Sequence, residues 1–490
     1  MRSLRKVAIG DRRYGIVGVK MNLILLIKDI RLILKDLKFQ VFFLVLVVLF
    51  IISAISSAVT YKTLNEEFQT DLYRHQQRAS DGISTQMIKM LESNPLHVIN
   101  KPSPAILFSS YPNYPDKINN GIIFYTPTFD YYGSETEELF QLNWYFIISI
   151  LASFIMLILS FESISHEKRA GTLRLLSIYG IKRQVIFWHK YFCYMFLYLI
   201  IIIPPAMVSL ILFFALSGTW SALFMLKLFL LLLISIPFTS FFVILGIFIS
   251  MFKNYRNAIV VVVFIWLFFV VIVPQSANII AEQVLPQKTS IEYEDMRVTA
   301  YNDEYQIWND EHEIYILDQH RLREGTRVRA INACEEKESL INQLEIDENK
   351  RQLLLIQNIS SISPFTQYEK ISEIILDKGF YLLKFQQETA KSSIIQIANL
   401  MKEQDSRDEL SLHHFYSKAE REKMVLRNSE ETPFSNSIFE QPNLLFVTEI
   451  ETETLAGKFK KVFINLLPIL FLNIVLILVS VVRFERLDIR

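Results

Sequence analysis

The side chains best suited to chemistry gather in one basic stretch, residues 163–190. Gly171, Thr172 and Leu173 follow the acidic residue Glu167 closely, and the pattern predicts a short helix with a small-residue gap. Another protein's surface can approach such a gap, and basic side chains beside it can pair with acidic groups on a partner or with anionic lipid. The only acid of the stretch is Glu167, and its bases are Lys168, Arg169, Arg174, Lys182, Arg183 and Lys190.

The motifs of common enzyme and metal sites are missing or incomplete. The spacing of Gly10 and Gly15 comes nearest to a phosphate-binding loop, but Ile16 follows where the phosphate-binding lysine would stand. A zinc-binding H-E-x-x-H pattern begins at His312 and fails at Ile316, where the second ligand is needed. No nucleophile elbow of the G-x-S-x-G kind occurs. We therefore predict no catalytic residue, no metal site and no cofactor in this chain.

The composition narrows the class of protein further. The 490 residues include 50 basic and 50 acidic side chains, so the bulk charge shows no nucleic-acid footprint and no nucleic-acid partner is expected. Cys193 and Cys334 are the two cysteines, which exclude a disulfide scaffold and any four-cysteine metal site. Half of the residues are apolar, and they gather in blocks of about twenty, the length that spans a bilayer as a helix.

Six apolar blocks are long enough to cross a membrane. A soluble buried helix would seldom run this long without a charge. Lys227 is the one charged side chain inside these blocks and lies near the outer end of the fourth, while Glu162 stands at the cytoplasmic end of the second. We therefore predict an all-α integral membrane protein with six transmembrane helices, and secondary transport through a buried acid is disfavoured. The predicted spans are 39–60, 142–161, 191–217, 221–252, 258–274 and 462–482.

Charge sorts the segments between the spans. Residues 1–38 carry ten basic and three acidic residues, and 163–190 carry six and one. By contrast, 61–141 carry six basic and ten acidic residues, and 275–460 carry 21 and 33. The positive-inside rule therefore places both termini, including the tail 483–490, and the loop 162–190 in the cytoplasm.

Residues 22–38 predict an amphipathic helix just before the first span. Lys28, Arg31, Lys35 and Lys38 lie opposite an apolar face, which favours a helix in the headgroup plane that contacts membrane lipid. A soluble packing helix is the alternative. The apolar face is formed by Leu23, Leu26, Ile27, Ile30, Ile33, Leu34 and Leu37.

The loop after the second span resembles the cytoplasmic signature of ABC-2-type transporter permeases. It looks closest to the subgroup with nitrous-oxide-reductase maturation and gliding-motility permeases, and the amphipathic helix and the six spans also fit. One departure is visible, because family members often carry a proline before the basic residue, where this chain reads Gly180-Ile181-Lys182-Arg183. Glycine can make that turn too. The matching features are Glu167, Gly171-Thr172-Leu173, the Leu-Leu-Ser turn at 175–177, Arg183 and Lys190.

The resemblance implies the membrane permease subunit of an ABC transporter, an exporter in a bacterial cytoplasmic (inner) membrane. ATP would be bound and hydrolysed by a separate ABC ATPase subunit. A second permease chain, identical or a similar paralogue, would complete the assembly. The loop would be the coupling helix that docks on the ATPase, and the matching positions for this role are Glu167, Gly171, Thr172, Leu173, Arg174 and Arg183.

The outer segments are predicted to be mainly helical. Residues 61–141 begin as helix (62–91) and then turn irregular around several prolines, whereas 275–460 predict long amphipathic helices. Ser363-Pro364-Phe365 resembles a feature in the outer domain of the same permease subgroup. Residues 401–427 are also predicted helical, and 430–443 are predicted to form a loop.

Other classes of protein stay open at this point. A non-transport sensor or scaffold could use its outer helices to bind a partner, and the basic loop would then merely anchor the spans. A membrane enzyme is disfavoured because no acid–base or metal constellation is present. The cargo of a transporter could be a lipid, a peptide, a protein or a copper- or sulfur-linked species.

Overall fold

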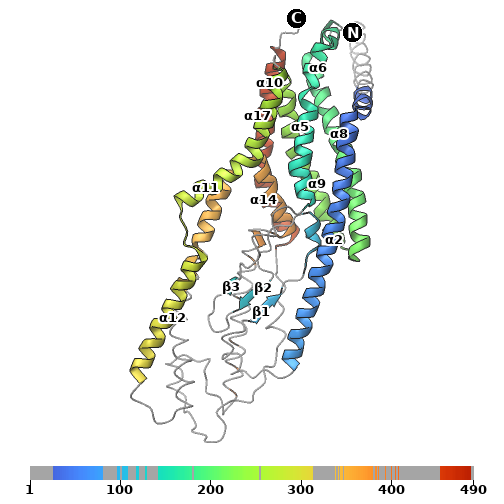
Figure 1. Cartoon of the computed structure of the whole chain (residues 1–490). Coiled ribbons are helices and arrows are strands. Elements are labelled where there is room, and N and C mark those ends of the chain that lie inside the picture. The colour runs from blue at the N-terminus through green and yellow to red at the C-terminus, as the bar shows by residue number, and fades with distance from the viewer. Residues whose placement is uncertain are drawn as a thin grey trace, which may run out of the picture.

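The computed structural model describes ten stretches of the chain and isolated positions between 337 and 407. The predictions for residues 1–25, for most of 401–427 and for 430–443 lie outside the described residues. The described chain is an elongated helical bundle, with α6, the C-terminal end of α17 and helix 26–34 at one end (Figure 1). The stretches are 26–80, 96–99, 102–108, 117–120, 127–129, 142–178, 181–252, 255–312, 347–378 and 453–486.

Six described helical stretches are long and apolar enough to cross a membrane. An apolar α-helix suits a bilayer because it satisfies its backbone hydrogen bonds within itself. The predicted class, an all-α integral membrane protein with six membrane helices, is confirmed. The six candidate spans are Leu37–Arg74, Trp144–Arg169, Arg183–Ser217, Ala222–Ile249, Ile259–Val284 and Leu455–Glu485.

Four spans are continuous helices and two contain a π-helical segment. The second span passes through η2 and the fifth through η3, and the indole N–H of Trp266 donates to Ser153 Oγ at 3.2 Å between these two spans. Such π-helical turns are rare and often occur at functional sites. The elements are α2 (Leu37–Ser80), α4 (Trp144–Phe146), η2 (Ile147–Ala152), α5 (Ser153–Phe161), α8 (Arg183–Ser217), α9 (Ala222–Ile249), α10 (Tyr255–Leu267), η3 (Phe268–Ile272), α11 (Val273–Val284) and α17 (Leu455–Glu485).

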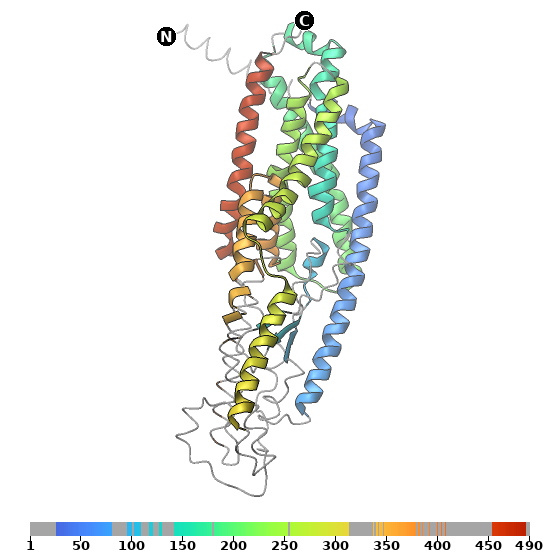
Figure 2. The ribbon, with the colours of Figure 1, turned by 60° about the vertical axis from the view of Figure 1, so that its left-hand side comes forward.

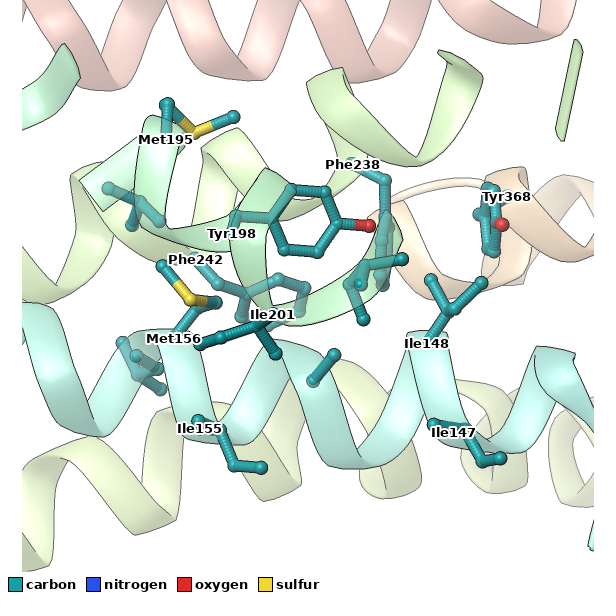
Figure 3. Packing of buried hydrophobic residues seen from close by; sticks show 14 of the residues in the cluster. Ile147, Ile148, Ile155, Met156, Met195, Tyr198, Ile201, Phe238, Phe242 and Tyr368 are labelled. Carbon is teal, nitrogen blue, oxygen red and sulfur yellow. The ribbon is translucent and has the colours of Figure 1, made fainter. Parts of the chain in front are cut away.

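The core of the bundle lies where α5, α8 and α9 meet, and α2 covers α8. Tyr368, from α14 (Pro364–Leu376), inserts into this core and stacks on Phe238 of α9, with ring centroids 4.8 Å apart. Figure 3 shows Tyr368 near Phe238 and Ile148 within the buried cluster. Asn473 of α17 donates to the backbone carbonyl of Pro237 at 2.8 Å, which ties the sixth span to the fourth.

The chain re-enters the bundle between the fifth and sixth spans. Helix α12 (Ser290–His312) extends beyond the end opposite α6, as does α2 (Figures 1 and 2). Residues 347–360 are helical and return along α11 and α12, with Gln352 Nε2 donating to the carbonyl of Leu285 at 3.2 Å. Ser363 then caps α14 and donates to the carbonyl of Phe269 in η3 at 2.5 Å. Helix α14 therefore begins halfway along the fifth span.

Helix α14 ends at the far end of the bundle, where a buried carboxylate joins three helices. Asp377, in the left-handed conformation with φ 57°, caps the C-terminus of α14. Its carboxylate pairs with Lys227 of α9 at 2.7 Å and with Lys458 of α17. Lys227, which the sequence placed towards the end of its apolar block, is thus held by an ion pair. The pairs fix α14 between α9 and α17.

The outer segment 61–141 contains a small sheet that the sequence did not predict. Its strands β1 (Leu96–Ile99), β2 (Lys117–Asn120) and β3 (Pro127–Phe129) pair antiparallel in the order β1-β2-β3. The register places Val98 opposite Ile118. The strands are only three or four residues long, so the alternation that marks a strand in a sequence has almost no length in which to show.

Candidate functional site

The basic loop folds into two short helices that form a hairpin at one end of the bundle. They are α6 (Ser163–Arg169) and α7 (Thr172–Ile178), and Gly171 lies between them with φ 72°. An L-side chain rarely adopts this left-handed conformation, so glycine suits the break. The sequence predicted one short helix across 167–173. The structure instead shows a glycine turn, in which the Thr172 hydroxyl donates to the carbonyl of Glu167 at 3.2 Å.

A three-membered ion pair lies behind this hairpin. The Lys190 ammonium, in the second turn of α8, contacts Asp29 Oδ2 at 2.7 Å and also pairs with Glu167. The three side chains are only 11% (Lys190), 22% (Asp29) and 18% (Glu167) exposed. Pairs this well buried are strongly coupled to local packing. Helix 26–34, α6 and α8 are therefore held together by one lysine.

His189 completes the cluster. Its Nε2 lies 3.1 Å from Asp29 Oδ2. Burial acts to raise the pKa of Asp29, but the hydrogen bond with His189 and the charge of Lys190 outweigh it and lower that pKa to about 2. Asp29 is thus a carboxylate throughout the physiological range, which keeps the ion pair intact.

A pocket of about 200 Å³ opens between helix 26–34, α7 and α8. Its charged part comprises Lys28, Asp29, Glu167 and Lys190, and Thr172 and His189 add polar groups. Apolar side chains from α7, α8 and the segment between them form the rest. Within the described chain, Glu167 Oε2 is buried and has no hydrogen-bond partner. The apolar lining includes Leu175, Leu176, Ile181, Val185 and Ile186.

The predicted coupling residues divide into exposed and inward-facing groups. Gly171, Thr172 and Arg174 are exposed, and a Cβ added at Gly171 would meet nothing within 4 Å. Leu173, by contrast, is fully buried, and Glu167 points inward to its ion pair. The structure thus brings half of the predicted set to one accessible surface.

Arg183 anchors the C-terminus of the described chain rather than the α7 surface. Its Nη1 donates to the backbone carbonyl of Glu485 at 2.6 Å and to that of Phe484 at 3.4 Å. The neighbouring Gln184 donates to the Glu485 carboxylate at 2.6 Å. Cationic groups are favourable near helix C-termini, where carbonyl groups lack partners. These contacts tie the end of the sixth span to the start of the third.

Two exposed apolar residues complete the surface of α7, and neither was among the coupling positions predicted from the sequence. Leu175 is 54% exposed and Ile178 is 75% exposed, whereas Leu173 points into the bundle. A pattern of apolar residues every third position along 172–178 could have indicated a second, outward-facing stripe. We define the docking face as Gly171, Thr172, Arg174, Leu175 and Ile178. Exposed apolar groups flanked by basic ones are typical of a surface that another protein covers.

Metal-binding chemistry finds no support in the described residues. No group of three or more His, Cys, Asp or Glu side chains lies close enough there to hold a metal ion. Cys193 is buried, and Cys334 and Glu313 lie outside the described residues. Around the hairpin, the described side chains thus offer a buried ion-paired cluster and an exposed apolar surface.

Comparison with known families identifies the chain. Residues 23–489 match the family model described as ABC-2 family transporter protein, and the match does not distinguish a subgroup. No curated protein and no solved structure is similar enough to the chain to count as a match. The matched region includes every candidate span, the hairpin and its buried ion pair, so the chain belongs to the ABC-2 family transporter proteins and is the membrane permease subunit of an ABC transporter.

Proposed function

We propose that this permease works as an exporter driven by a separate ABC ATPase that docks on the α6–α7 hairpin. The observation that carries the proposal is the docking face on α7, with Leu175 and Ile178 exposed beside Arg174. ATP is bound and hydrolysed by the partner, and this chain alone hydrolyses none. We also propose that the chain is related to the nitrous-oxide-reductase maturation and gliding-motility permeases, because its loop resembles theirs.

The buried ion pair supplies the mechanical link. Lys190 holds Glu167 on α6 and Asp29 on helix 26–34 at once, so a push on the hairpin moves three elements together. Arg183 extends the link to the C-terminal end of α17 through its bonds to the carbonyls of Phe484 and Glu485. Closure of the ATPase would thereby reach the first, third and sixth spans.

The orientation follows from charge. The hairpin, helix 26–34 and the last turn of α17 occupy one end of the bundle (Figure 1), and the basic excess lies in the segments at that end. The positive-inside rule assigns this end, with both termini, to the cytoplasm of a bacterial inner membrane. The basic residues of helix 26–34 would contact anionic lipid there.

A second permease chain, identical or similar, completes the pathway. The second and fourth spans are 67% buried within this chain, whereas the fifth and sixth are only 11% buried. The apolar surface of these outer spans is available to lipid and to a second copy. Because two of the six spans are covered so little by the rest of this chain, we expect the subunit to pair with a second permease chain.

The docking proposal is tested by co-purification of the cognate ATPase with Ile178→Asp. A carboxylate on an apolar contact should weaken association, because the charge loses its water on docking. Ile291→Asp is the matched control, since Ile291 is 74% exposed on α12, at the other end of the bundle, and Ile178 is 75% exposed. We expect ATPase recovery and transport-linked growth to fall with Ile178→Asp alone. Equal recovery with both variants would favour the sensor or scaffold alternative.

A further inference from the structure

Helix α14 reaches the middle of the bundle without crossing it. Its cap Ser363 bonds to Phe269, near the middle of the fifth span, and its last residue is followed by Asp377, which pairs with Lys227 near the start of the fourth span. Thirteen residues of helix extend about 20 Å, less than the roughly 30 Å of a hydrocarbon core. Polar groups on such a half-helix are tolerated where they face protein or a water-filled pathway.

The helix has two faces of opposite character. Tyr368, Ile371 and Ile375 face the core, and all three are nearly or fully buried. Glu369 and Glu373 are one helical turn apart on the other face. Thr366 lies one turn before Glu369 on that same face. We call Thr366, Glu369 and Glu373 the polar face of α14.

The two carboxylates of the polar face form no ion pair within the described chain. Lys370 lies between them in the sequence, and its ammonium donates a hydrogen bond to the backbone carbonyl of Gln357 at 2.6 Å. Among the described residues, neither Glu369 nor Glu373 has a hydrogen bond or an ion pair through its carboxylate, although each is partly buried. This contrasts with Asp377 at the end of the same helix, which holds two lysines. Ionisable groups at membrane depth usually have a function, so two carboxylates without a partner indicate a binding site.

A second observation also points to a ligand at this place. Thr366 is 7% exposed and its Oγ1 has no hydrogen-bond partner within the described chain. The next residue, Gln367, is 3% exposed; its amide donates to the carbonyl of Ser361, but its Oε1 has no partner there. Buried polar atoms are nearly always hydrogen-bonded. Gln367 lies on another side of α14, but the orphan Oγ1 of Thr366 shares a face with the two carboxylates and indicates a missing donor there.

The electrostatics agree with a missing cation. Burial raises the pKa of the Glu369 carboxyl to about 7, although the charge of Lys370 opposes the shift. Burial and the charge of Glu369 raise the pKa of Glu373 well above its usual range. Two adjacent carboxyls in this setting take up protons unless a positive charge arrives to replace them.

We propose that the polar face of α14 binds a primary ammonium group carried on an apolar molecule, and that this is a recognition site for the transported cargo. An ammonium has three N–H donors, which suit two carboxylates and the orphan oxygen of Thr366. Phe365 flanks the polar face and packs on Tyr145 with ring centroids 5.7 Å apart, so an apolar body has aromatic surface beside the charge. The cargo assignment rests on the proposed transport function, whereas ammonium binding does not.

The test uses the purified full-length chain in lipid nanodiscs, without ATPase. The probe is octylamine, with octan-1-ol as the uncharged control and octyltrimethylammonium as the control that has charge but no N–H donor. Binding is followed through the shift of the unfolding temperature at about pH 8, where Glu369 has released its proton. We expect octylamine to raise that temperature more than either control does.

Isosteric variants locate the site. Glu369→Gln and Glu373→Gln should each weaken octylamine binding by about tenfold or more, because each removes one charge-assisted hydrogen bond. Thr366→Val, which changes no charge, should weaken it less. Glu282→Gln is the control, because Glu282 is an exposed acid on the neighbouring α11. Size-exclusion profiles confirm that each variant is folded before it is titrated.

Two results would overturn the proposed ammonium site, and a third would bear only on the transport function. Equal octylamine affinity in the wild type and in the double variant Glu369→Gln/Glu373→Gln would overturn the site. An equal effect of octan-1-ol and octylamine on the wild type would reduce the binding to apolar partition and would overturn it as well. Failure of ATPase association with the wild-type chain would instead remove the proposed transport function and leave the ammonium result standing.

Discussion

Gly246 of α9 lies against Ser160 of α5 so closely that a methyl group added at Gly246 would come within 2.0 Å of the serine oxygen. The same methyl group would lie 2.9 Å from the backbone carbonyl of Leu157. The serine hydroxyl can rotate away from the first contact, but the second involves a backbone oxygen and requires movement of one helix. The glycine therefore sets the distance between the second and fourth spans. These two spans pack on each other and are the two most buried of the six.

We expect Gly246→Ala to destabilise the protein by about 1–3 kcal/mol, the usual cost of overpacking a core. Gly457→Ala is the matched control, because a Cβ at Gly457 would meet its nearest neighbours at an ordinary 3.7 Å. The control should be neutral or slightly stabilising, since alanine is the better helix former. Thermal unfolding in detergent distinguishes the two, and equal unfolding temperatures would contradict the close approach.

The buried ion pair provides a second prediction. Lys190→Met leaves the carboxylates of Asp29 and Glu167 buried without their shared cation, and breaking such a pair costs about 3–5 kcal/mol. The control is Lys38→Met, because the Lys38 side chain is 60% exposed in its pair with Glu162. An exposed pair contributes below about 1 kcal/mol. Denaturant unfolding of the two variants should differ accordingly.

The same variant separates docking from coupling. Lys190→Met leaves Leu175 and Ile178 on the surface, so the ATPase should still be recovered with the permease. Transport should nevertheless fall, because the link from α6 to helix 26–34 is lost. Loss of ATPase recovery with Lys190→Met would show that the ion pair shapes the docking face itself.

Gly171 and Gly218 form a natural pair for testing the hairpin. Both have a left-handed φ, 72° and 70°, and a Cβ at either would meet nothing within 4 Å. Gly171→Trp and Gly218→Trp should therefore cost similar stability, about 1–2 kcal/mol. Only Gly171→Trp should lower the recovery of the ATPase, because only Gly171 lies on the docking face. Gly171→Asn should be milder, since asparagine tolerates this conformation.

The orientation predicts which cysteines an impermeant reagent can reach in intact cells. Single-cysteine chains would carry Leu340→Cys, at a position 62% exposed, or Arg169→Cys, at an exposed position on α6. The native Cys193 and Cys334 would be replaced by alanine in both. Labelling should modify position 340 and spare position 169 until the cells are permeabilised. The reverse pattern would invert the topology.

The raised pKa of Glu369 predicts a pH dependence of stability. Because its pKa is about 7 in the folded protein against an ordinary 4.5, the folded state binds the proton more tightly. This stabilisation is complete below about 4.5 and is lost as the pH rises through about 7. Burial is the main cause of the raised pKa of Glu369, and the charge of Lys370 on the same helix opposes it.

We therefore expect the wild-type unfolding temperature to fall between about pH 5 and pH 8, and that of Glu369→Gln to fall less. The measurement is thermal unfolding in detergent at constant ionic strength. Glu282→Gln should keep the wild-type slope, because Glu282 is exposed. An unchanged slope in Glu369→Gln would show that this carboxyl is solvated like an ordinary glutamate.

The amino-acid sequence by itself determined the membrane fold. A bilayer requires apolar runs of about twenty residues that satisfy their own backbone, and this requirement is read directly from composition along the chain. The basic loop with Glu167 and Gly171 was also visible as a resemblance to the coupling loop of ABC-2-type permeases, and its docking role stays a prediction. The small sheet was not visible, since strands of three or four residues leave no periodic pattern.

Only the tertiary structure decided what each helical face meets. Helical periodicity shows that Leu173 and Leu175 point in different directions, but not which one is covered. Glu167 could pair with any cation, and the approach of α8 supplies Lys190. Likewise, Glu369 and Glu373 share a helical face in any conformation, and only the return of α14 to the middle of the bundle buries them. Periodicity is local, whereas burial and ion pairing depend on segments that are distant in the chain.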